Sequence, residues 1–100
     1  MSADNKAAEL VKELNAFAED RFNQGQYAEA EERFRTALDV YHQSAKESGN
    51  RHTAVLATIS GLVKALEAQG RQHEAARVLE SEEPTIAELI GMLREQVGAG

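Results

Sequence analysis

The sequence repeats one short pattern at a distance of 45 residues. Residues 23–34 read NQGQYAEAEERF and residues 68–79 read AQGRQHEAARVL, so Gln-Gly and Glu-Ala recur at the same offsets and Phe34 aligns with Leu79. A repeat of this length is typical of stacked helical hairpins, each of which buries its apolar face against its neighbour. The chain is therefore predicted to be an all-α array, with the first repeat at about residues 8–49 and the second at about 50–83.

Apolar residues recur at steps of three and four along most of the chain, which is the spacing of one face of a helix. The predicted helices span residues 4–24, 27–48, 51–69, 72–81 and 85–97. Gly25, Gly49 and Gly70 follow the first three helices, where a left-handed backbone favours glycine. Asn50 is the predicted N-cap of the third helix, because its side chain can accept a hydrogen bond from an unpaired backbone N–H.

Residue size within each repeat indicates how the helices pack. Ala30 and Ala75 lack bulk and let neighbouring helix axes approach closely. Phe34 and Leu79, one turn later, are predicted to point inward and fill the space that remains. In the first helix, the predicted apolar face comprises Leu10, Leu14, Phe17, Ala18 and Phe22.

The residues after position 81 predict a separate fifth helix. Pro84 lacks a backbone N–H and clashes with the preceding turn, so it is not expected to continue a helix. Thr85 and Glu88 then match the capping box, in which each side chain satisfies a backbone N–H at a helix start. A capping helix at about residues 84–97 is therefore predicted to follow the two hairpins, giving five helices in one domain of 100 residues.

Composition excludes several classes of function. The chain has no cysteine, which excludes disulfides, thiolate metal sites and cysteine nucleophiles. Its formal net charge is −6, whereas nucleic-acid binding usually requires a positive surface. No stretch reaches the ~18 apolar residues of a membrane span, and the first residues lack the basic and apolar regions of a signal peptide. A cytoplasmic protein with no nucleic-acid or membrane partner is expected.

No residue pattern indicates catalysis or metal binding. His42, His52 and His73 are not three or four residues from one another, so no helix presents two of them to a metal ion. The sequence contains neither a Gly-x-Ser-x-Gly nucleophile turn nor a glycine-rich phosphate loop. Paired glutamates such as Glu31-Glu32 are interpreted as a solvated helix face. The sequence predicts a non-enzymatic protein without cofactor or metal, and an enzyme or metal-dependent regulator is the weakest alternative.

The first repeat resembles the tetratricopeptide repeat family. It carries the family's order of small residue, glycine, tyrosine, alanine, phenylalanine and alanine, at Ala18, Gly25, Tyr27, Ala30, Phe34 and Ala37. The longer period and the segment RHTAVLATISGLVKALEAQGRQHEA are similar to the long-repeat branch found in kinesin light chains. The resemblance covers about residues 10–80 and implies a short right-handed α-solenoid of two hairpins plus a capping helix.

The same resemblance implies a binding scaffold with a concave groove, lined by the first helix of each hairpin, that takes a peptide or a helix of a partner protein. The amide of Asn15 would donate to and accept from a peptide backbone at once. Lysines and glutamates are mixed along this groove, which argues against a clamp for a C-terminal carboxylate. The predicted groove residues are Lys12, Asn15, Glu19, Phe22, Asn23, Ala57, Ser60, Lys64 and Glu67.

The predicted fifth helix carries three charged residues where the first helix carries eight. Such an apolar excess marks either a surface for a partner or a helix that is simply well buried in a small core. As an alternative function, this helix would pair two copies into a homodimer, with the repeats as a rigid spacer. The candidate interface residues are Ile86, Ile90, Met92 and Leu93.

Overall fold

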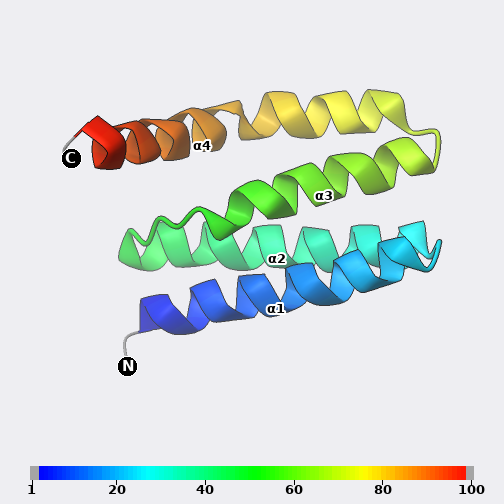
Figure 1. The fold of residues 1–100 in the computed structure, drawn as a ribbon, viewed down its shortest axis with the longest axis horizontal. Coiled ribbons are helices and arrows are strands. Elements are labelled where there is room, and N and C mark those ends of the chain that lie inside the picture. The colour runs from blue at the N-terminus through cyan, green and yellow to red at the C-terminus, as the bar shows by residue number, and fades with distance from the viewer. Residues whose placement is uncertain (1–2, 99–100) are drawn as a thin grey trace.

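Four helices form two hairpins that lie side by side (Figure 1). The computed structural model describes residues 3–98, and it describes the side-chain burial of residues 6–96. The helices are α1 (Ala3–Asn23), α2 (Tyr27–Ser48), α3 (Ala54–Ala68) and α4 (Gln72–Gly98). All regular structure within residues 3–98 is helical, which confirms the predicted all-α class.

A glycine follows each of the first three helices, as predicted. Gly25, Gly49 and Gly70 have φ angles of 79°, 70° and 75°. Residues that carry a Cβ rarely adopt this left-handed backbone conformation. The start of α3 differs from the prediction, because the helix begins at Ala54 and Thr53 precedes it at the N-cap position. The side chain of Asn50 instead donates to Ser44 Oγ at 3.4 Å, so it belongs to the end of α2.

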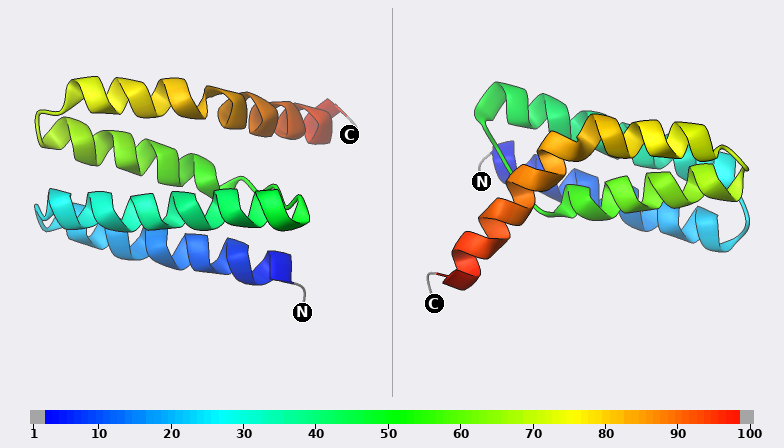
Figure 2. Two further views of the ribbon diagram at one scale, coloured as in Figure 1. Left: turned by 180° about the vertical axis from the view of Figure 1, so that it is seen from behind. Right: turned by 90° about the horizontal axis from the view of Figure 1, so that it is seen from above.

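Pro84 lies inside α4 and does not end it, so the predicted break and the separate fifth helix are wrong. The exposed proline bends the helix, and the second half of α4 leaves the direction of the first (Figure 2, right). A bend of this kind relieves the clash between the proline ring and the carbonyl four residues earlier. The helix continues because its apolar positions stay in phase across the bend, from Ala75 before it to Leu89 after it, both of which are buried.

Two contacts hold α4 on either side of the bend. Before it, Glu82 Oε1 lies 2.8 Å from His42 Nε2 on α2. After it, Glu88 pairs with Arg51 in the connection between α2 and α3. Glu88 is therefore engaged with Arg51, and the predicted capping box with Thr85 does not form because both residues lie within a continuous helix.

Phe34 occupies the centre of the core between the two hairpins. It is 1% exposed, and its ring lies against Gly61 of α3, where an added Cβ would come within 2.2 Å of Phe34 Cζ. The neighbouring positions are the small residues that the repeat predicted, since Ala18 and Ala30 are fully buried. The core residues of the first repeat therefore pack as the sequence predicts.

The buried face of α1 is rotated by about one residue from the predicted one. Val11 and Ala18 are fully buried, whereas Leu10 and Phe17 are 43% and 41% exposed on the outer side. The Phe17 ring is covered there by the guanidinium groups of Arg21 and Arg33, whose Cζ atoms lie 4.7 and 5.0 Å from its centroid. Cation–π attraction of this kind stabilises an aromatic ring at the surface.

A polar network joins the hairpins beside the core. Glu31 Oε1 accepts hydrogen bonds from Arg71 at 2.6 Å and from Gln69 at 3.0 Å, and Oε2 accepts from Arg35 Nε at 2.9 Å. Burial alone would raise the pKa of Glu31, but these donors outweigh it and hold the pKa below its usual value. Glu31 is thus a contact between α2 and the second hairpin, and its side chain is only 12% exposed, contrary to the predicted solvated face.

Candidate functional site

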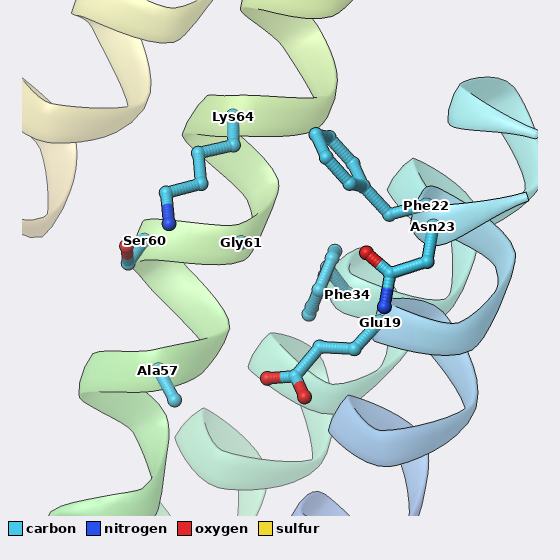
Figure 3. Close-up of a pocket in the computed structure, with 8 residues that line it drawn as sticks. All are labelled: Glu19, Phe22, Asn23, Phe34, Ala57, Ser60, Gly61 and Lys64. Carbon is cyan, nitrogen blue, oxygen red and sulfur yellow. The ribbon is translucent and has the colours of Figure 1, made fainter. Parts of the chain in front are cut away.

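A hollow of about 320 Å³ lies between α1 and α3 on one face of the molecule (Figure 3). It is lined by Glu19, Phe22, Asn23, Phe34, Ala57, Ser60, Gly61 and Lys64. Six of these are residues that the sequence predicts for the groove, three from each of the two helices. The structure therefore brings the predicted groove positions of α1 and α3 to one place.

The α1–α3 hollow combines an apolar floor with charged edges. Phe34 and Gly61 form the floor, where the ring of the core phenylalanine lies under a helix residue that has no side chain. The carboxylate of Glu19 comes from α1 and the ammonium of Lys64 from α3, so the two charges belong to opposite walls (Figure 3). A ligand in this hollow would meet apolar surface beneath it and one charge of each sign beside it.

A second hollow of about 370 Å³ lies on the other side of α3, against α4. Ser60 and Lys64 line this α3–α4 hollow as well as the first one, and Glu67 lines only this one. The remaining lining is apolar: Leu56, Ile59, Val63, Leu79 and Ile86. The α3 residues of the predicted groove therefore form a ridge between two adjoining hollows.

Asn15 does not occupy the exposed groove position that the sequence predicts. It is 6% exposed, its Nδ2 donates to the carbonyl of Ala54 at 3.2 Å, and its Oδ1 accepts from Thr58 Oγ1 at 2.7 Å. The amide therefore ties α1 to the first turn of α3, and it is already engaged on both sides. Lys12, one turn earlier, is exposed but lines neither hollow.

His52 and Tyr41 form an aromatic contact that sequence reasoning missed. Their rings meet edge-on, with centroids 4.9 Å apart. Both ring nitrogens of His52 and the hydroxyl of Tyr41 are buried and have no hydrogen-bond partner among the residues of the structure. Burial lowers the pKa of His52, and the nearby ammonium of Lys12 lowers it further. The imidazole is therefore neutral at pH 7.

Acid is expected to weaken the fold through His52. Because the pKa of His52 is lowered in the folded chain, the unfolded chain takes up a proton first as the pH falls below about 6.5. The free energy of unfolding should therefore decrease from pH 7 to pH 5, by at most about 1.4 kcal/mol per pH unit for this group. Urea unfolding at several pH values should show a shallower pH dependence for His52→Gln. The exposed His73→Gln is the control, and equal slopes for the two variants would contradict this assignment.

The second half of α4 exposes part of the interface that the sequence proposes. Ile90 and Leu93 are 41% and 39% exposed, whereas Ile86 and Met92 are partly buried and pack against the core. Leu79, in the first half of α4, is 46% exposed, although the repeat predicted that it points inward. Leu79 and Phe34 occupy the same position of the repeat. The helix α3 covers Phe34, whereas no described helix covers Leu79 in the same way.

The described side chains offer no catalytic or metal-binding arrangement. Within residues 3–98, no group of three or more histidine, aspartate or glutamate side chains is placed to hold a metal ion. None of the described helices has both the length and the apolar character that crossing a membrane requires. The chain matches no family model, and no curated protein or solved structure is significantly similar to it.

Proposed function

We propose that the chain is a non-enzymatic protein-interaction module that binds a peptide segment or helix of a partner protein in the α1–α3 hollow. The observation that carries this proposal is the convergence of Glu19, Phe22, Asn23, Ser60 and Lys64, all predicted groove residues, on one hollow. The resemblance of the first repeat to tetratricopeptide repeats, from which these groove positions were predicted, also supports the proposal. Asn15 has no direct role in this proposal, since its amide is engaged between α1 and α3.

The hollow favours a ligand with an apolar anchor and charges on both sides. An apolar side chain would rest on the floor formed by Phe34 and Gly61, with Phe22 beside it. A basic group of the ligand would face Glu19, and an acidic group would face Lys64. The walls are rigid helices already in place, so little conformational entropy is lost from the protein when the ligand binds.

Reversing the charge of Lys64 is expected to weaken ligand binding at least about tenfold, because one wall would then repel the acidic group of the ligand. Peptides selected from a displayed library on the immobilised chain provide the ligands, and titration calorimetry provides the affinities. Lys64→Glu is compared with Lys46→Glu, which makes the same charge change at an exposed position of α2 outside the hollow. Equal affinities for the two variants, or no selected peptide at all, would refute the assignment.

A second candidate function is self-association through α4, with the hairpins as a rigid spacer. It is favoured by Ile90 and Leu93, which leave about two fifths of their surface exposed on the second half of α4. Exposed apolar rows of this kind mark interfaces in proteins of this size. Neither Ile90 nor Leu93 lines the α1–α3 hollow.

A further inference from the structure

The α3–α4 hollow has a counterpart in the first hairpin, where α3 fills it. The 45-residue repeat relates four lining residues of the hollow to residues of α1 and α2: Leu56 to Val11, Val63 to Ala18, Leu79 to Phe34 and Ile86 to Tyr41. The four residues of the first hairpin are at most 2% exposed. They form clusters with buried residues of α3, namely Val55, Ile59, Leu62 and Leu66. The helix α3 therefore covers this face of the first hairpin.

The second hairpin leaves the equivalent face open. Leu79 is 46% exposed, and the other three counterparts are only partly buried: Leu56, Val63 and Ile86. Pro84 lies between Leu79 and Ile86, but both residues line the hollow, so the bend in α4 does not divide this face. Within residues 3–98, no helix takes the place on Leu79 that α3 takes on Phe34.

We propose that an amphipathic helix of a partner protein docks in the α3–α4 hollow, in the place that α3 takes on the first hairpin. This site adjoins the α1–α3 hollow along the ridge of Ser60 and Lys64, but the proposal does not depend on binding in that hollow. The partner helix would run antiparallel to α4, because α3 runs antiparallel to α2 (Figure 1). Its contacting segment would match the 15 residues of α3 in length.

The contacts of α3 specify which residues the partner helix needs. Gly61 faces Phe34, where an added Cβ would lie 2.2 Å from Cζ, so a small residue is required opposite Leu79. Apolar residues are required six and two positions before this small residue and one and five positions after it. These are the places that buried residues of α3 hold relative to Gly61: Val55, Ile59, Leu62 and Leu66.

Lys64 determines the charge that the partner helix should carry. In the α1–α3 hollow, Glu19 of α1 and Lys64 of α3 belong to opposite walls (Figure 3). Lys64 is the counterpart of Glu19 in the repeat, and it also lines the α3–α4 hollow. The partner residue three positions after the small residue would therefore face an ammonium group. Charge complementarity favours an acidic side chain at that position.

The first helix of a second copy does not meet these requirements. By the repeat, α1 is the counterpart of α3. Where α3 buries Ala65 and Leu66, however, α1 carries Asp20 and Arg21. Burying charged side chains is costly unless they are paired. These charges favour a helix from a different protein as the occupant.

A fluorescently labelled peptide tests the proposal on the full chain. The peptide has the sequence of residues 54–68, AVLATISGLVKALEA, with its own Lys64→Glu substitution. Titration followed by anisotropy should show binding, and Leu79→Glu in the chain should weaken it at least about tenfold. Two controls should leave the affinity unchanged: Leu10→Glu, at a similarly exposed leucine of α1, and Asn23→Arg, which alters only the α1–α3 hollow. Circular dichroism verifies that each variant is folded.

An exchange of charge tests the register of the docked helix. The unsubstituted peptide, which keeps its lysine, should bind the parent chain several-fold more weakly than the glutamate peptide, and Lys64→Glu in the chain should reverse this preference. An unreversed preference would overturn the proposed register. No binding of the glutamate peptide, or binding that Leu79→Glu does not weaken, would overturn the docking site. A parent dimer in ultracentrifugation that Leu79→Glu dissociates would identify a second copy as the occupant and overturn the partner helix.

Discussion

Phe34→Ala is expected to lower the free energy of unfolding by about 3–5 kcal/mol, the range for truncating a buried phenylalanine. The ring is 1% exposed and fills the space between α2 and Gly61 of α3, so its removal leaves a cavity between the two hairpins. The neighbouring Ala18 on α1 and Ala30 on α2 are too small to fill this cavity. Urea unfolding followed by circular dichroism at 222 nm would measure the loss.

Leu79→Ala is the matched control, because Leu79 occupies the same position in the second repeat. It is 46% exposed, so its truncation should cost less than about 1 kcal/mol in the monomer. Both variants are compared at a concentration where the chain is monomeric, which keeps association from adding to stability. Similar losses for the two variants would show that Leu79 is covered in solution by part of its own chain.

The glycine turns and the first hairpin were predictable because local chemistry decides them. Gly49 ends α2 in the left-handed conformation, as its place after an apolar helical stripe indicated. Ala30 and Phe34 are buried in the order that the repeat predicted. The α1–α3 hollow follows from the same register, since residues spaced by three and four on two neighbouring helices must line one face.

Some predictions of burial in α1 were wrong because the sequence supports two alternatives almost equally. Leu10 and Val11 are adjacent apolar residues, and only contact with the other helices decides which of them turns inward. Asn15 was read as a groove residue because the sequence does not display its partners, Thr58 and the Ala54 carbonyl. A buried amide is tolerated when its polar atoms are hydrogen-bonded, and those bonds come from residues about 40 positions away.

Pro84 is the clearest case in which tertiary contacts outweigh a local signal. A proline inside a helix costs roughly 3 kcal/mol relative to alanine, which made a break the natural prediction. The burial of Leu89 and the pairing of Glu88 with Arg51 hold the second half of α4 to the rest of the chain. Both contacts join residues far apart in sequence, so a reading of residues 81–88 alone could not include them.

Gly61→Ala is expected to lower the free energy of unfolding by about 1–3 kcal/mol, the usual cost of overpacking a core. Alanine favours a helix over glycine by about 1 kcal/mol, but the new Cβ would lie 2.2 Å from Phe34 Cζ. Because Phe34 is 1% exposed, a shift of its ring away from the new Cβ would disturb its packing in the core. The clash should therefore outweigh the gain in helix propensity, and chemical denaturation would report the net loss.

Gly91→Ala separates the packing cost from helix propensity. Position 91 has the same residue in the same sequence context, but a Cβ there meets no described atom within 4 Å. The monomer should therefore gain up to about 1 kcal/mol of stability, opposite in sign to Gly61→Ala.

Phe34→Leu supplies a second test of the clash at position 61. Because a smaller side chain should relieve this clash, a double-mutant cycle of Phe34→Leu and Gly61→Ala should give a coupling energy of about 1 kcal/mol. Additive effects of the two substitutions would mean that Gly61 is required for a reason other than the Phe34 ring.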